Sequence, residues 1–168
     1  MAGLIGAILL LACVAEVLLT KHDTVTRRRF LIPQSFSGQV YLIHTGAYNG
    51  PDAAGDRVQT MSVPGSGVLV TTDRMPTRYE DTYSDVTPSG RLAQLQVQEL
   101  GVIQDTPASR NDPHRLVFNP NAGILELPNC KIFAESFYVG TRRFLLQDHT
   151  SDVLENFAET HPEVCVRK

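Results

Sequence analysis

The sequence predicts a mainly β domain, an antiparallel β-sandwich or barrel-like domain with an N-terminal transmembrane or signal helix and one short C-terminal helix. Three observations predict this class. The first twenty residues are almost all apolar. The part that follows consists of short runs rich in Val, Leu, Ile, Phe and Tyr, separated by Gly and Pro. After Gly140 the apolar residues change to a helical spacing.

The N-terminal segment Gly3–Leu19 is nearly uninterrupted apolar sequence, and Glu16 is its only charge. As a helix it would span roughly 25 Å, the short end of what crosses a bilayer. We therefore assign residues 1–20 to a hydrophobic anchor or signal segment, 21–28 to a linker, and 29–168 to one β-rich globular domain. A buried core helix is less favoured, because so small a chain offers little core to surround it.

Three forms of export fit this segment. An uncleaved anchor needs only the apolar length, and a cleaved signal peptide needs a small residue before the cut, which Ala15 would supply. A lipoprotein signal needs Leu-x-small-Cys, and Leu10–Cys13 approximates it, which makes Cys13 a weak lipidation candidate. The sequence leaves open whether the segment is cleaved, lipidated or retained.

Charge and cysteine usage point to opposite sides of a membrane. Lys21 and the triplet Arg27–Arg29 follow the apolar segment, so the positive-inside rule would keep the domain in the cytoplasm. Cys130 and Cys165 are the cysteines outside that segment, and such a pair in a small exported domain suggests a disulfide, against two unpaired thiols. We expect a membrane-associated chain whose domain is extracytoplasmic, periplasmic or on the cell surface. The arginine triplet is then expected to contact lipid headgroups or to act as a topology signal.

Alternating apolar residues and turn signals define the expected strands. Gly38–His44 has apolar residues on both faces and is expected to be buried on both sides. Three turn signals predict three hairpins, joining 57–63 to 67–72, 79–83 to 91–100, and 115–118 to 123–127. The remaining strands are expected at 29–32 and 131–139.

The C-terminal part contains the expected helix. Val153–Thr160 has an apolar stripe, Ser151 or Asp152 can cap its start, and Pro162 ends it. One short helix is too little to cover a parallel sheet, which favours antiparallel pairing. The segments Thr45–Gly55 and Asp105–Pro113 are expected to be loops that present a surface to partners.

Four stretches of the domain follow one another in a characteristic order. The first is the opening Phe30-Leu31-Ile32-Pro33, followed by Phe36, Gly38 and Val40. The others are 63–71, 79–90 and 137–144, the last of which reads Phe-Tyr-Val-Gly-Thr before Phe144. In these stretches the chain resembles a family of bacterial envelope and lipoprotein-like domains of unknown function, which opens with an aromatic-Leu-Ile-Pro motif. The resemblance covers nearly the whole domain. It implies a compact β-rich domain outside the cytoplasm, and it implies no activity.

No stretch carries a catalytic, cofactor-binding or metal-binding motif, so we assign no residue to these roles and expect no cofactor. The net charge is −3, and no basic patch beyond the arginine triplet supports nucleic-acid binding. His44 lies inside a strand and is expected to be a satisfied core or interface histidine. The acidic pair Glu80-Asp81 lacks a calcium-loop pattern and is expected at a solvated strand edge.

The sequence therefore favours a membrane-tethered or exported β-sandwich domain with a non-catalytic binding or envelope-structural role. Its expected partners are the membrane, through residues 1–20, and an envelope protein or glycan. One alternative is a hydrolase or accessory subunit that uses His114 or His149 with nearby carboxylates. Another is a membrane-anchored regulator that faces the cytoplasm.

Overall fold

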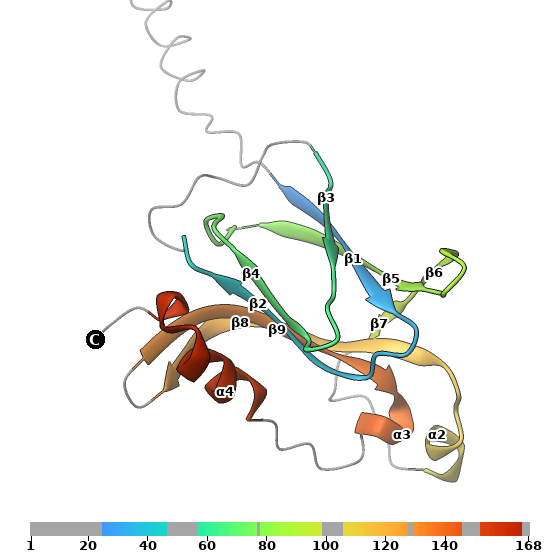
Figure 1. The fold of residues 1–168 in the computed structure, drawn as a ribbon. Helices are drawn as coiled ribbons and strands as arrows, with labels where there is room; N and C mark the ends of the chain where they lie inside the picture. The colour runs from blue at the N-terminus through green and yellow to red at the C-terminus, as the bar shows by residue number, and fades with distance from the viewer. Residues whose placement is uncertain are drawn as a thin grey trace, which may run out of the picture.

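Two β-sheets face each other in the computed structural model (Figure 1). The structure describes residues 25–46, 57–76, 78–98, 106–127, 130–145 and 152–165. The strand order is β3-β1-β5-β6 in one sheet, which we name sheet A, and β4-β2-β9-β8-β7 in the other, sheet B. Neither sheet closes into a barrel over these ranges, so the architecture is a sandwich.

The strands of sheet A are β1 (Thr26–Pro33), β3 (Gln59–Ser62), β5 (Tyr79–Val86) and β6 (Leu92–Gln94). Those of sheet B are β2 (Gly38–His44), β4 (Val68–Thr71), β7 (Gln96–Gln98), β8 (Arg115–Leu127) and β9 (Cys130–Thr141). Strand β2 has the bounds that the sequence predicts. Strand β1 begins three residues before the predicted start of the domain at residue 29.

The prediction of antiparallel pairing is wrong for four of the contacts between neighbouring strands. Strand β1 runs parallel to β3 and β5, β2 runs parallel to β4, and β7 runs parallel to β8. The cause is that the chain passes from sheet A to sheet B after β1 and again after β3, instead of turning back within one sheet. Strands that follow one another in the same sheet after such a passage, such as β1 and β3 or β2 and β4, therefore run in the same direction. Pairs β2·β9, β5·β6 and β8·β9 are antiparallel.

The three predicted hairpins have three different outcomes. The turn at Pro88–Gly90 does join an antiparallel pair, β5 and β6. The segment Pro64–Gly67 instead connects β3 of sheet A with β4 of sheet B, which corrects the first prediction. Residues 115–127 form the single strand β8 with a register shift between Phe118 and Asn121, so the third hairpin is wrong as well. An irregularity in a long strand produces the same Asn-Pro-Asn signal as a turn.

Inward-facing side chains of both sheets form the core of the sandwich. Phe30 stacks on Tyr83 with ring centroids 5.3 Å apart, and Phe137 of sheet B meets both rings edge-on at 5.1 and 4.9 Å. The other buried members of this cluster are Ile32, Val40, Leu42, Val63, Leu95, Val117 and Val139. Leu95 is buried where the chain leaves β6 of sheet A for β7 of sheet B, and its amide donates to the carbonyl of Tyr83 at 2.9 Å. The predicted long strand 91–100 is split at this residue.

A second apolar cluster covers the outer face of sheet B. Helix α4 (Val153–Thr160), which has the predicted bounds, places Leu154 and Ala158 there, and the short helix η2 (Pro162–Val164) adds Val164. The helices pack against Ile43 and Ile132, among others, so β2 is buried on both faces, as predicted. The helix α4 begins after Asp152, whose side chain makes no capping bond; Ser151 lies outside the described residues.

Besides η2, two further short helices were not predicted. Helix α2 (Pro107–Arg110) lies within the expected loop Asp105–Pro113, and helix α3 (Arg142–Leu145) follows β9. In the part of the chain that the structure describes, no helix has the length and hydropathy needed to span a membrane. The predicted anchor, residues 1–20, lies outside that part.

Gly67 makes the passage from sheet A to sheet B possible. Its φ is +76°, a value that favours glycine, and a Cβ built on it would lie 2.5 Å from the carbonyl oxygen of Gln39 and 3.1 Å from the Phe36 ring. Gly65 in the same connection has neither constraint, because nothing lies within 4 Å of its would-be Cβ.

We predict that Gly67→Ala lowers the free energy of unfolding by about 2 kcal/mol or more, because backbone strain of this kind alone costs about 1–3 kcal/mol and a clash with fixed backbone adds to it. Gly65→Ala is the matched control and should change stability by less than about 0.5 kcal/mol. Urea unfolding followed by circular dichroism measures both. Equal stabilities of the two variants would contradict the assigned role of Gly67.

Candidate functional site

A cluster of charged side chains is buried between the two sheets, near the start of β1. Its centre is Arg28, which is 1% exposed. The Arg28 guanidinium donates from Nε and Nη2 to the two carboxylate oxygens of Asp81, at 2.7 and 2.8 Å. It also donates from Nη1 and Nη2 to the two oxygens of Glu135, both at 2.6 Å. Since Arg28 and Asp81 belong to sheet A and Glu135 to sheet B, one guanidinium links the sheets.

His44, the last residue of β2, completes this ion cluster. Its Nε2 lies 2.8 Å from a carboxylate oxygen of Glu135, and its Nδ1 lies 3.3 Å from the carbonyl oxygen of Asp73. Both neighbours are acceptors, so hydrogen bonds to both require a proton on each ring nitrogen. The cluster thus consists of Arg28, His44, Asp81 and Glu135. The prediction of a satisfied core histidine at His44 is confirmed.

Aromatic rings close the ion cluster on the side of sheet A. The Arg28 guanidinium carbon lies 4.6 Å from the ring centroid of Tyr79 and 5.6 Å from that of Phe30, both within the range of cation–π attraction. The Tyr83 hydroxyl donates to Asp81 at 3.3 Å. Burial raises the pKa of Tyr79 and of Tyr83, and the nearby carboxylates add to the effect. Both hydroxyls therefore stay protonated near neutral pH.

The two carboxylates respond differently to burial. At Asp81 burial is the larger effect and raises the pKa of the carboxyl group, although the hydrogen bonds from Arg28 oppose it. At Glu135 burial also acts to raise the pKa, but the hydrogen bonds from His44 and Arg28 together hold it below its usual value. For Arg28 burial acts to lower the pKa, and the bonds to both carboxylates raise it overall. The charge on Glu135 is thus the one most firmly stabilised.

The chemistry of the ion cluster is that of a structural clamp. Over the described ranges, every buried side-chain nitrogen or oxygen has a hydrogen-bond partner, and those of the cluster are partnered by one another and by the backbone. No set of three His, Cys, Asp or Glu side chains in those ranges could hold a metal ion. The expected solvated edge at Glu80-Asp81 is wrong for Asp81, whose side chain is 8% exposed, and the expected headgroup contact is wrong for Arg28.

A pocket of about 580 Å³ lies at the opposite end of sheet A. It is formed where β1, β3 and β5 end. Because these strands are parallel, their C-terminal ends lie side by side. The strands are held together there by hydrogen bonds from the Val63 amide to the Leu31 carbonyl, 2.8 Å, and from the Gln34 amide to the Val86 carbonyl, 3.0 Å. The lining residues carry no charge; they are Leu31, Pro33, Gln34, Ser35, Ser62, Val63, Val86, Thr87 and Pro88. An uncharged, mainly apolar pocket of this size suits a small ligand.

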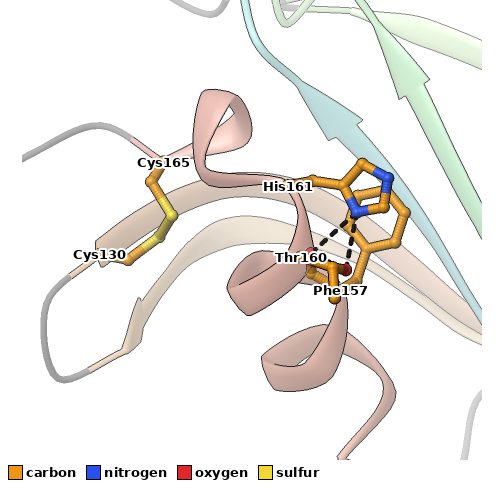
Figure 2. Close-up of a disulfide and its surroundings, with 5 residues drawn as sticks. All are labelled: Cys130, Phe157, Thr160, His161 and Cys165. Atoms are coloured by element: carbon orange, nitrogen blue, oxygen red, sulfur yellow. Dashed lines mark hydrogen bonds between the residues drawn. A yellow bond between two sulfur atoms is a disulfide. The ribbon is translucent and has the colours of Figure 1, made fainter.

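The two cysteines of the domain form a disulfide between the start of β9 and the end of η2 (Figure 2). The bond joins Cys130 to Cys165 over 35 residues. It ties the C-terminal helices to sheet B beside the second apolar cluster. Because its sulfur is joined to Cys130, Cys165 cannot bind a metal ion together with the nearby His161. The His161 ring instead stacks on Phe157, with ring centroids 4.1 Å apart, and contacts the Thr160 hydroxyl (Figure 2). Cys13, the lipidation candidate, lies outside the described residues.

The histidines of the hydrolase alternative do not form a site in the described residues. His114 has an 82% exposed side chain and lies 2.5 Å from a carboxylate oxygen of Asp112. Asp112 also pairs with Arg142, and bonds from His114 lower the pKa of its carboxyl group. His114 does not line the apolar pocket. His149 lies outside the described residues, as does most of the expected presenting loop Thr45–Gly55.

Comparison with known proteins identifies no relative with an assigned activity. No protein-family model and no curated protein matches the chain. Among solved structures, the fold is similar to that of a "Putative Lipoprotein from Bacillus anthracis", with 11% sequence identity, a TM-score of 0.49, and coverage of 83% of this chain and 94% of that one. A likeness of this extent indicates no function for this chain. The resemblance of the sequence motifs to envelope domains therefore stays a prediction.

Neither the ion cluster nor the pocket was predicted from the sequence. The sequence does contain a pattern that indicates the ion cluster. In β1 the inward positions are Thr26, Arg28, Phe30 and Ile32, which follow the period of two of a strand. With Phe30 and Ile32 assigned to the core, the same alternation places Arg28 inside, where a charge requires partners. The pocket has no such signal, since its residues come from three strands and the turns after them.

We predict that Arg28→Met lowers the free energy of unfolding by about 3–5 kcal/mol, because it leaves two carboxylates buried without their cation. Arg27→Met is the control one residue away. Arg27 pairs with Glu80 at 3.1 Å with both side chains more than half exposed, and its loss should cost less than about 1 kcal/mol. Denaturant unfolding at pH 7 measures both variants. A loss for Arg28→Met no larger than for Arg27→Met would contradict the clamp.

Proposed function

We propose that this chain is an exported, membrane-held binding domain of the bacterial cell envelope, without catalysis, that takes an uncharged and largely apolar ligand in the pocket at the end of β1, β3 and β5. The observation that carries the proposal is the pocket itself: it has the volume of a ligand site, no charged lining, and a frame of hydrogen-bonded strands. The buried ion cluster, by contrast, is saturated by its own partners.

Two features support export. The apolar segment Gly3–Leu19 is followed by a single sandwich domain, and that domain contains the Cys130–Cys165 disulfide. Structural disulfides persist outside the cytoplasm and are rare within it. The main rival, a regulator that faces the cytoplasm, requires these two thiols to be reduced in the native protein.

The pocket lies at the end of β1 opposite to the end at which the chain enters the strand. Strand β1 starts six residues after the last residue of the predicted anchor and runs for eight residues to the pocket edge, a length of roughly 26 Å at about 3.3 Å per residue. An anchored domain would thus present the pocket away from the bilayer. A ligand that arrives from the envelope space fits this placement better than a lipid of the same membrane.

A neutral fluorescent probe tests the pocket. We expect N-phenyl-1-naphthylamine to bind the full chain saturably with increased emission, and Ser62→Trp to weaken binding at least about tenfold by filling the space above Val63. The matched control is Thr60→Trp, on the same exposed face of β3 but outside the pocket lining, which should bind like the unmodified chain. Equal affinity of both variants would place probe binding elsewhere and contradict the assigned site.

The native mass of the chain tests export. Extracted from its membrane fraction without reductant, the protein should be lighter by the mass of two hydrogens than the reduced chain, because Cys130 and Cys165 are joined. The same spectrum reports cleavage of the N-terminal residues or a lipid on Cys13. Free thiols in the protein, protected from reduction during extraction, would favour the regulator that faces the cytoplasm.

A further inference from the structure

The first half of β5 has a neighbouring strand on one side only. On that side β1 pairs with every residue of β5, Tyr79–Val86. On the other side β6 pairs with Ser84–Val86 alone, and it lies beside only the last part of β5 (Figure 1). The chain then leaves sheet A at Leu95 and enters β7 of sheet B. Among the described strands, none continues along the edge Tyr79–Thr82 on this open side.

Backbone hydrogen bonds show which residues of β5 face the open side. The carbonyls that flank and end the strand, those of Arg78 and Val86, accept from amides on the side of β1, at 3.1 and 3.0 Å. The carbonyl of Tyr83 instead accepts from the Leu95 amide on the other side, at 2.9 Å. Successive residues of a strand direct their N–H and C=O groups to alternate sides. The N–H and C=O of Asp81 are therefore directed to the open side, beyond the point where β6 ends.

A second pocket, of about 570 Å³, lies at this open edge. It is lined by residues 81–83 of β5 and by residues 94–97, the segment in which the chain leaves sheet A. All of them lie in the described ranges, and none of them lines the apolar pocket at the strand ends. Because β6 runs antiparallel to β5 and ends with Gln94 opposite Ser84, this pocket occupies the place in which a continued β6 would lie. We name it the edge pocket.

The lining of the edge pocket is rich in uncharged hydrogen-bonding side chains. Thr82, Gln94 and Gln96 are exposed, and a hydroxyl or an amide can both donate and accept. The charged lining residue is Asp81, and its two carboxylate oxygens already accept from the Arg28 guanidinium. A ligand with neutral, polar side chains matches this lining.

We propose that the edge pocket binds an extended segment of a partner polypeptide with uncharged polar side chains, which pairs with Tyr79–Thr82 as an added strand of sheet A. The main chain of such a segment supplies donors and acceptors at the spacing of a strand edge, and side chains beside it give specificity. An open edge is a template for pairing unless the fold covers it. The site is separate from the apolar pocket, so the inference goes beyond the proposed function and does not depend on it.

Amide hydrogen exchange tests the edge directly. The probe is a capped hexapeptide of alternating threonine and glutamine, added to the isotope-labelled full-length chain in detergent micelles. In the free chain we expect the Asp81 amide to be at least about tenfold less protected than the Thr82 amide, which faces β1. Bound peptide should slow exchange at Asp81 at least about tenfold and leave Thr82 unchanged. Equal protection of the two amides in the free chain, or no binding at millimolar peptide, would overturn the proposal.

Backbone methylation of the peptide separates strand pairing from other kinds of binding. An added edge strand uses only alternate amides of its main chain, so a peptide that is N-methylated at every second residue should still bind. Methylation of every residue removes all donors and should abolish binding. A fully methylated peptide that binds as well as the parent would contradict strand pairing, as would loss of binding in both alternately methylated peptides.

A variant of the chain tests the location. Gln94→Trp fills the edge pocket and should weaken binding of the parent peptide at least about tenfold. Leu92→Trp is the matched control, because Leu92 is exposed on the same strand two residues away and does not line the edge pocket. Equal affinity of the two variants would overturn the assigned site. Chitotetraose serves as a neutral glycan probe, and binding of this sugar without binding of the peptide would overturn the peptide in favour of a glycan.

Discussion

The guanidinium of Arg28 is the contact on which the arrangement of the two sheets depends. It is held by paired hydrogen bonds to Asp81 of sheet A and to Glu135 of sheet B, and it is almost completely buried. A buried ion pair adds little net stability compared with a well-packed apolar core, but it tolerates few alternatives, because a shifted register would leave charges unpaired. The cluster thus specifies which strands of the two sheets face each other.

The same chain path produces a sandwich with two chemically different ends. Because β1, β3 and β5 run in one direction, the ion cluster around Arg28 lies near their starts, and their ends form the uncharged pocket around Leu31, Val63 and Val86. The buried charges and the uncharged pocket are therefore separated by most of the length of a strand.

The outer face of sheet B is a second apolar surface, and the C-terminal helices cover it. Helix α4 has eight residues and no side-chain cap, so on its own it would be marginal in water. Burial of Leu154 and Ala158 against Ile43 and Ile132 stabilises it, and the Cys130–Cys165 disulfide restricts the unfolded chain. A loop of this size is expected to contribute about 3–4 kcal/mol by that restriction. The C-terminal segment is thereby kept on a face that would otherwise expose apolar side chains.

Local patterns in the sequence were enough to predict a mainly β sandwich, the bounds of β2 and α4, and the burial of His44, because each depends on the spacing of side chains within one segment. Pairing direction and the ion cluster depend on residues far apart in the chain: Arg28 is separated from Asp81 by 53 positions and from Glu135 by 107. The Pro-Gly connection after β3 has the local chemistry of a hairpin turn. This connection crosses from one sheet to the other because the two sheets are buried against each other. In the crossing, Gly67 lies in close contact with Gln39 and Phe36. Sequence periodicity determines which residues face inward, whereas their partners are decided by which strands the tertiary structure brings together.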